Sequence, residues 1–128
     1  MKIILCFSHK LNDIQLLELK NRYDISNSKD IIYLPQDLQF IWSNVSENPD
    51  IYSNNYNKIK NFIKATANEN DLILIQGEWG YTYNLVTYCK KHHLTPIYSF
   101  SIRNSKEIIK NNISTKTSIF EHVKFKEY

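Results

Sequence analysis

The stretch Leu72-Ile73-Leu74-Ile75-Gln76-Gly77-Glu78-Trp79-Gly80 carries the clearest structural signal in the chain. Its first four residues are a short apolar run, which is typical of a strand buried on both faces of a parallel sheet. The next five residues hold both glycines of the chain, and apolar residues at helical spacing follow at Leu85, Val86 and Cys89. A strand, a tight turn and a helix in this order predict an α/β domain.

Strands and helices are expected to alternate along the rest of the chain. Apolar runs predict further strands at residues 2–7, 30–34 and 95–100. Helical patterns lie between them, at residues 12–23, 35–42 and 56–67. Asn12 and Gln15 form a capping-box pattern, and Pro35 suits the first turn of a short helix. Residues 44–53 form the most loop-like stretch.

The end of the chain follows a different pattern. Apolar Ile119, Val123 and Phe125 alternate with polar side chains, and a polar turn is expected at residues 111–115. This alternation predicts a C-terminal β-hairpin, which either extends the edge of the sheet or forms a dimer contact. The 128 residues suit one domain. We therefore expect a single α/β domain over residues 1–128, with a doubly wound, mainly parallel sheet and flanking helices.

Composition restricts the classes of function. The net charge of +3, without a dense Lys/Arg block, favours a small anionic ligand over duplex nucleic acid. No signal peptide and no apolar run of about 20 residues is present, so neither secretion nor a membrane partner is expected. Cys6 and Cys89 lie in apolar patterns and are expected to be buried, reduced thiols. These features predict a cytoplasmic protein.

Polar segments are expected to meet at the carboxyl ends of the parallel strands. Ser8-His9-Lys10 follows the first strand, and Ser99, Ser101 and Arg103 leave the last parallel strand in the same direction. Lys10 suits a phosphate as a mobile charge, and the guanidinium of Arg103 suits bidentate clamping of phosphate oxygens. His9 is suited to proton transfer near neutral pH. The alternative for each is an ordinary solvated surface residue.

The segment Gln76-Gly77-Glu78-Trp79-Gly80 is expected to be a binding loop. Glycine is needed where φ is positive or where a ligand approaches the backbone, although a tight turn alone also explains it. Trp79 is expected either to stack on a nucleobase or to fold back onto the domain. Glu78 is a candidate general base, a sugar ligand or a charge at the helix N-terminus. No Walker, dinucleotide-binding or acyl-transfer motif and no metal-ligand cluster is present, so no metal or cofactor is expected.

Several segments together resemble a known family. They run in the same order over nearly the whole chain and include Phe7-Ser8-His9-Lys10-Leu11, Tyr33-Leu34-Pro35, Leu38-Gln39, Trp42-Ser43, Leu74-Ile75-Gln76-Gly77-Glu78-Trp79-Gly80, Pro96-Ile97-Tyr98, Arg103, His122-Val123-Lys124-Phe125 and Tyr128. The set is similar to a small Csx-type accessory family of type III CRISPR loci. Glu78, Trp79 and Tyr81 depart from the family pattern, which has Gln-Gly-Asp-Phe-Gly followed by a small residue.

The resemblance implies a ring nuclease. Such an enzyme cleaves cyclic oligoadenylate, most often cyclic tetra-adenylate, and switches off type III CRISPR signalling. It implies a Rossmann-like (CARF-like) homodimer that works without metal and leaves linear products with a 2′,3′-cyclic phosphate. Lys10 and Arg103 would then stabilise phosphate charge and His9 would assist proton transfer. The implied ligand-binding residues are Ser8, Gln76, Gly77, Glu78, Trp79, Gly80, Tyr81, Ser99 and Ser101.

Two other classes of function remain open at this point. The same crevice would bind the cyclic nucleotide without cutting it in a sponge or a sensor protein, because binding requires fewer aligned groups than catalysis. A dimeric interaction protein without a nucleotide ligand is the third possibility. Turnover of the ring, and a change in melting temperature on adding it, distinguish the three.

Overall fold

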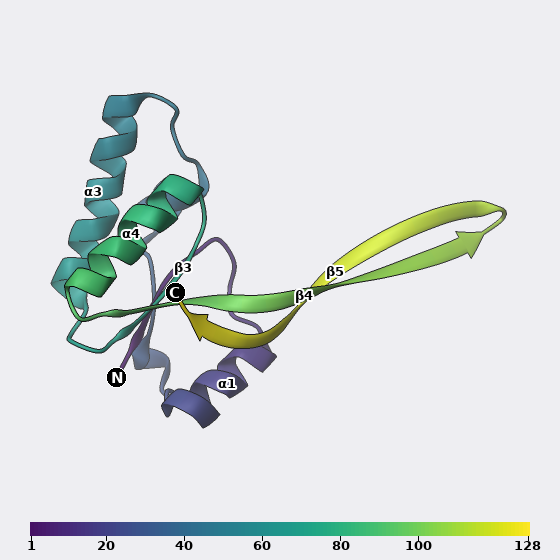
Figure 1. Cartoon of the computed structure of the whole chain (residues 1–128), viewed down its shortest axis with the longest axis horizontal. Coiled ribbons are helices and arrows are strands. Elements are labelled where there is room, and N and C mark those ends of the chain that lie inside the picture. The colour runs from purple at the N-terminus through teal and green to yellow at the C-terminus, as the bar shows by residue number, and fades with distance from the viewer.

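The computed structural model describes residues 1–128 as an α/β domain with a long protruding hairpin (Figure 1). The sheet contains β1 (Ile3–Phe7), β2 (Ile31–Tyr33), β3 (Leu72–Gln76), β4 (Thr95–Lys110) and β5 (Ile113–Glu127), in the order β2-β1-β3-β4-β5. The first four strands are parallel, and β5 runs antiparallel to β4. The expected α/β class, mainly parallel sheet and terminal hairpin are confirmed.

Four helices flank the sheet. They are α1 (Asp13–Tyr23), α2 (Gln36–Ser43), α3 (Pro49–Thr66) and α4 (Trp79–Lys91), and one 3-10 turn spans Ser28–Asp30. None of them combines the length and the apolar character that crossing a bilayer requires. The capping box of α1 forms as expected, because Asn12 accepts from the Gln15 amide while the Gln15 side chain accepts from the Asn12 amide.

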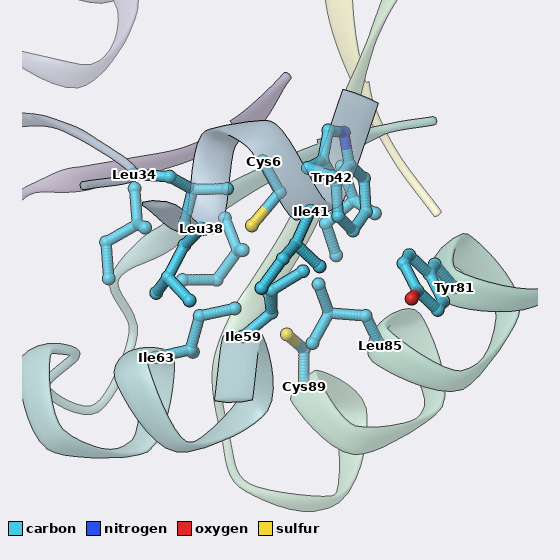
Figure 2. Packing of buried hydrophobic residues seen from close by; sticks show 13 residues of the cluster. Cys6, Leu34, Leu38, Ile41, Trp42, Ile59, Ile63, Tyr81, Leu85 and Cys89 are labelled. Carbon is cyan, nitrogen blue, oxygen red and sulfur yellow. The ribbon is translucent and has the colours of Figure 1, made fainter. Parts of the chain in front are cut away.

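The apolar strands are buried on both faces, as their sequence predicts. Side chains alternate between the faces of a strand, so β1 contributes Ile4 and Cys6 to one side and Ile3 and Leu5 to the other. The first side packs against α2, α3 and α4 (Figure 2). The second side packs against α1 and against Phe125 of β5. Two hydrophobic layers therefore hold the central strands in place.

Both cysteines lie in the layer beneath α2, α3 and α4. Figure 2 shows Cys6 of β1 and Cys89 of α4 among isoleucine and leucine side chains. They are free thiols, and burial raises the pKa of Cys89 to about 12. Burial, with a smaller contribution from Cys89, also raises the pKa of Cys6. The prediction of two buried thiols is confirmed.

The expected loop at residues 44–53 is too long. Helix α3 already begins at Pro49, and Asn48 is its N-cap, whose side chain accepts from the amides of Asp50 and Ile51. Asparagine followed by proline is a helix start, because proline suits the first helical position. The sequence interpretation treated this helix start as a turn.

The hairpin is longer than the sequence pattern indicated. Strand β4 does not end near Phe100 but continues to Lys110, and residues 102–121 are all exposed. The turn consists of Asn111 and Asn112, both at positive φ, as in tight hairpin turns whose twist matches that of the strands. We call residues 102–121 the arm. It projects away from the rest of the domain, which we call the body (Figure 1).

Candidate functional site

The strand order creates a switch point in the sheet. The chain passes from β1 to β2 on one side and then returns to β3 on the other side of β1. Ligands of open α/β sheets bind outside the carboxyl ends of the strands at such a reversal. A crevice of about 820 Å³ opens there. Its lining comes from the ends of β1 and β3, the neighbouring part of β4, the start of α1 and one residue of β5: Phe7, Ser8, His9, Lys10, Asn12, Gln15, Gln76, Gly77, Tyr98, Ser99, Phe100, Ser101 and Phe120.

The lining combines three kinds of chemistry. Lys10 supplies a positive charge and His9 an imidazole, while hydroxyl and amide side chains supply hydrogen bonds. Phe7 and Phe120 supply aromatic rings. Tyr98 and Phe100 also border the crevice, but they alternate with Ser99 and Ser101 along β4, so their rings face the other side of the sheet. No carboxylate is among the lining side chains. Such a surface suits an anion that carries flat rings and hydroxyl groups.

The end of β1 and the segment after it are held by α2. The Ser8 hydroxyl lies 3.0 Å from that of Ser43 in α2, and Gln39 donates from its amide nitrogen to the Phe7 carbonyl oxygen at 3.0 Å. The His9 ring meets the Phe7 ring edge-on, with centroids 5.3 Å apart. The side chains of Ser8, His9 and Lys10 are exposed to solvent in the crevice. The expected first segment of the site is therefore present.

Gln76 at the end of β3 and Gly77 after it line the crevice, and their contacts with neighbouring elements also hold its wall in place. The Trp42 indole donates to the carbonyl oxygen of Gln76 at 3.0 Å, and the side-chain oxygen of Gln76 accepts from the Ser99 amide at 2.8 Å. A Cβ at Gly77 would lie 2.6 Å from the Trp42 ring. Neither glycine has positive φ, so close packing explains the choice of glycine at Gly77.

Glu78 is the N-cap of α4. Its carboxylate accepts from the amides of Gly80 at 2.7 Å and Tyr81 at 3.2 Å, and from the Tyr52 hydroxyl at 2.7 Å. Burial, followed by the hydrogen bond to Glu78, raises the pKa of Tyr52. The Glu78 oxygens are thus occupied by the helix start and by α3, and this residue does not line the crevice. Of the three roles considered for Glu78 from the sequence, the structure shows the one at the N-terminus of the helix.

Trp79 and Gly80 of the expected binding loop, and the next residue Tyr81, lie outside the crevice. Trp79 is 90% exposed and stands away from the lining residues. Tyr81 is fully buried in the core, where its hydroxyl donates to the Tyr52 carbonyl oxygen at 3.3 Å, so its side chain is not available to a ligand. A Cβ at Gly80 would collide with the Tyr52 hydroxyl. None of these three residues at the start of α4 lines the crevice.

Strand β4 delivers Ser99 and Ser101 to the crevice but carries Arg103 beyond it. Arg103 lies on the arm, where its guanidinium donates to the Ser118 hydroxyl at 2.9 Å. It faces the same side as Ser101, one residue pair further out, and is paired across the strands with Phe120. The sequence interpretation placed Arg103 inside the crevice because it ended the strand at Phe100. The continued strand moves Arg103 outward.

A buried hydrogen-bond network behind Ser99 was not foreseen. The Ser99 hydroxyl contacts Nδ1 of His122, and Nε2 of His122 lies 2.5 Å from a carboxylate oxygen of Glu18 in α1. Burial alone would raise the pKa of Glu18, but hydrogen bonds from His122, Phe125 and Arg22 hold it below the ordinary value. In the sequence, His122 is one of the polar residues that alternate with Val123 and Phe125 in the expected hairpin.

A β-bulge brings His122 into this position. Phe100 pairs with Lys124 and Ser101 pairs with His122, so Val123 is the extra residue of β5. Without the bulge, His122 would face the opposite side of the sheet from Ser99. The sequence gives the alternation of β5 but no signal for the bulge, which explains why both His122 and Phe120 were missed.

Comparison with known proteins places the chain in a family. The profile described as "Uncharacterized protein MJ1673 family" matches residues 1–126. The chain belongs to the MJ1673 family. "Uncharacterized protein MJ1673" of Methanocaldococcus jannaschii is similar to it, with 37% identity over 127 residues that cover 99% of this chain and 96% of that protein. No solved structure matches. For this member of the MJ1673 family, function is therefore inferred from the crevice.

Proposed function

We propose that this protein is a ring nuclease that binds and cleaves cyclic oligoadenylate, with cyclic tetra-adenylate as the preferred ring. The observation that carries the proposal is the lining of the crevice, which joins Lys10 and His9 to the aromatic residues Phe7 and Phe120 and to several hydroxyl and amide groups, without a carboxylate. Phosphates suit the lysine, adenine bases suit the rings and ribose hydroxyls suit the polar groups. The family resemblance of the sequence adds the cyclic form of the ligand and the CARF-like fold.

The proposed reaction needs no metal ion. A ribose 2′-hydroxyl attacks the adjacent phosphate when the protein holds it in line with the departing 5′-oxygen. Lys10 stabilises the charge that develops on the phosphate oxygens, and Ser8 and Ser101 orient the sugar–phosphate backbone. The products are linear oligoadenylates with a 2′,3′-cyclic phosphate end.

A homodimer is part of the proposal. A single crevice of about 820 Å³ is the size of a pocket for a drug-sized ligand, whereas four linked nucleotides form a larger one. Two crevices facing each other across a two-fold axis suit a ring. One face of the arm carries Ile102, Ile108, Ile113 and Ile119, all exposed, and we call it the apolar face.

Charge along the apolar face favours a second copy as its cover. Glu121 lies on this face at the base of the arm, while Lys106 and Lys110 lie toward its tip. When two arms pack with opposite directions about a two-fold axis, the base of each arm meets the tip of the other. Glu121 then approaches the lysines of the second copy, and the isoleucines of both arms are covered together.

The test is incubation with radiolabelled cyclic tetra-adenylate in EDTA. We expect linear products with a 2′,3′-cyclic phosphate, and a rate that falls about 100-fold in Lys10→Ala, since one group that stabilises the developing charge is lost. Lys90→Ala, which removes an exposed lysine from α4, is the matched control and should retain the rate. An intact ring after prolonged incubation with excess enzyme would exclude the nuclease.

The second candidate is a protein that binds the ring without cleaving it. The position of Arg103 favours it, because only one of the two cations expected at the phosphates lines the crevice. Binding tolerates this arrangement better than catalysis does. Tight binding of cyclic tetra-adenylate with no product would assign the protein to this class, as a sponge or a sensor.

A further inference from the structure

Glu18, His122, Ser99 and Ser101 form a continuous chain of hydrogen bonds from the interior to the crevice. His122 and Ser99 are 8% and 7% exposed, and both serines line the crevice. The Ser101 and Ser99 hydroxyl oxygens are 3.2 Å apart. Buried polar groups are costly unless they are hydrogen-bonded, and here each of them is paired. The lining of the crevice thus connects to a buried carboxylate.

When the His122 ring is neutral, the chemistry of the other groups gives every hydrogen bond in this chain one direction. The Glu18 carboxylate is ionised and only accepts, so Nε2 of His122 carries the hydrogen that is donated to it. In a neutral ring Nδ1 is then an acceptor, and the Ser99 hydroxyl donates to it. Ser99 Oγ consequently accepts from the Ser101 hydroxyl and from the Gln15 amide nitrogen, which is 3.3 Å away.

This direction leaves an acceptor free at the crevice. Once Ser101 has donated its hydrogen to Ser99, its oxygen presents lone pairs to whatever lies in the crevice. A hydroxyl group placed there would donate to Ser101. Each hydroxyl in the chain then donates toward His122. A chain of hydrogen bonds with this direction can carry a proton from the crevice to His122.

We propose that the two serines relay a proton from the attacking 2′-hydroxyl of the ligand to His122, with Glu18 holding the imidazole. This inference rests on the proposed function and names the group that activates the nucleophile. Ser101 and Ser99 are the catalytic residues of the relay, since they line the crevice. His122 and Glu18 act through them and are positioning residues.

The proton and electron movements balance. The 2′-hydroxyl proton passes to Ser101 Oγ, the Ser101 proton to Ser99 Oγ, and the Ser99 proton to Nδ1 of His122. The 2′-oxygen forms its bond to phosphorus, and the bond from phosphorus to the 5′-oxygen breaks with its electron pair on oxygen. The 5′-oxygen takes a proton from water. The hydroxide left behind is neutralised when His122 returns its proton through the serines.

Other features of the fold support a role beyond packing. The bulge at Val123 turns His122 toward Ser99, and bulges of this kind aim side chains next to active sites. Glu18 is held by the amide of Phe125 at 2.9 Å and by Arg22 at 3.0 Å, so it is fixed before any ligand binds. A site in which the accepting pair is already oriented needs little reorganisation during reaction.

The first measurement requires no ligand. In protein labelled with 15N at histidine, long-range NMR correlations distinguish the two ring nitrogens, and the His122 signals are identified by their loss in His122→Asn. We expect His122 near neutral pH to carry hydrogen on Nε2 and none on Nδ1. Hydrogen on Nδ1 would overturn the relay, whatever the protein does to oligoadenylates.

The second measurement is the single-turnover rate on cyclic tetra-adenylate in EDTA. His122→Asn keeps an acceptor oxygen near the position of Nδ1 but cannot take a proton, and Ser99→Ala interrupts the path. Both should lower the rate about 100-fold or more, while ring binding is retained. Ser105→Ala, on the same face of β4 but outside the crevice, is the matched control. Rates within threefold of the wild type in both variants would exclude the relay.

The pH profile separates proton transfer from a purely structural role. The charged groups around the imidazole are Glu18 and Arg22 of α1, with Lys10 across the crevice. Strand β4 presents the hydroxyls of Ser99 and Ser101, and Arg103 follows on the same face one residue pair further out. The wild-type rate should fall on the acid side, because a protonated ring no longer accepts from Ser99. Glu18→Gln should move this fall to lower pH, since the carboxylate stabilises the protonated ring. If the rate of Glu18→Gln fell at the same acid pH as that of the wild type, the relay would be contradicted.

Different results would exclude the ring nuclease and the proton relay. If the wild type leaves every ring intact, the ring nuclease is excluded, and the NMR measurement alone decides whether the hydrogen-bond chain has the inferred direction. If the wild type cleaves and the variants cleave equally well, the nuclease stands and the relay is excluded.

Discussion

The body and the arm contain the same kinds of residue in opposite environments. In the body, Ile3, Ile4, Ile73 and Ile75 are completely buried between helices and neighbouring strands. In the arm, the four isoleucines of the apolar face are between 45% and 66% exposed. Burial of apolar area is the main favourable term in folding, so the body supplies the stability of the monomer and the arm contributes little to it. In the proposed function, the arm acts through what it contacts, either the ligand or a second copy.

The largest expected difference between the two regions concerns stability. Ile73→Ala creates a cavity in the core and should lower the free energy of unfolding by about 2–5 kcal/mol. Ile109→Ala removes the same atoms from the exposed polar face of the arm and should change it by less than about 0.5 kcal/mol. Urea denaturation measures both. Equal losses would show that the arm is part of the cooperative core.

The next difference concerns which aromatic side chain stacks on an adenine base. Phe120 stands at the base of the arm and lines the crevice, whereas Trp79 stands on the body and does not. Phe120→Ala should weaken binding of cyclic tetra-adenylate by about 1–3 kcal/mol, or roughly 5- to 150-fold, and Trp79→Ala should leave it unchanged. Calorimetric titration of both variants with cyclic tetra-adenylate shows which of the two side chains contributes to binding. The opposite result would restore the original sequence-based assignment of Trp79.

The smallest effect concerns association through the arm. Ile108→Asn places a polar group on the apolar face and should raise the dimer dissociation constant about tenfold, which corresponds to ~1.4 kcal/mol. Ile109→Asn makes the same change on the opposite face and is the control. Sedimentation equilibrium measures the association. A monomeric wild type, or equal effects of the two variants, would exclude the arm as the dimer contact.

The body was predictable from the sequence because burial leaves a pattern. The apolar runs of β1 and β3 and the capping box at Asn12 each gave the correct element. The arm was only half predicted, since β4 beyond Phe100 has no buried face and so no apolar alternation to mark it as a strand. The Asn48-Pro49 pair could have predicted the start of α3, but from the sequence it was assigned to a loop.

The site was predictable to the extent that it follows from the parallel sheet. The rule that carboxyl ends of parallel strands meet at one edge correctly brought together Ser8, Lys10, Gly77 and Ser99. It could not supply Phe120 and His122, because they arrive on an antiparallel strand whose register depends on a bulge. It also assigned Glu78 and Tyr81 to a ligand, although the former caps α4 and the latter fills the core.

The central claim is that the crevice at the ends of β1 and β3, beside residues 98–101 of β4, binds the phosphates and bases of the ring. Titration of 15N-labelled protein with cyclic tetra-adenylate tests it residue by residue. The amide signals of Ser8, Lys10, Gly77, Ser99 and Ser101 should shift together and saturate, while those at the tip of the arm, near Asn111, shift only if the ring changes the assembly. No shifts at saturating ligand, or shifts confined to the arm, would contradict it.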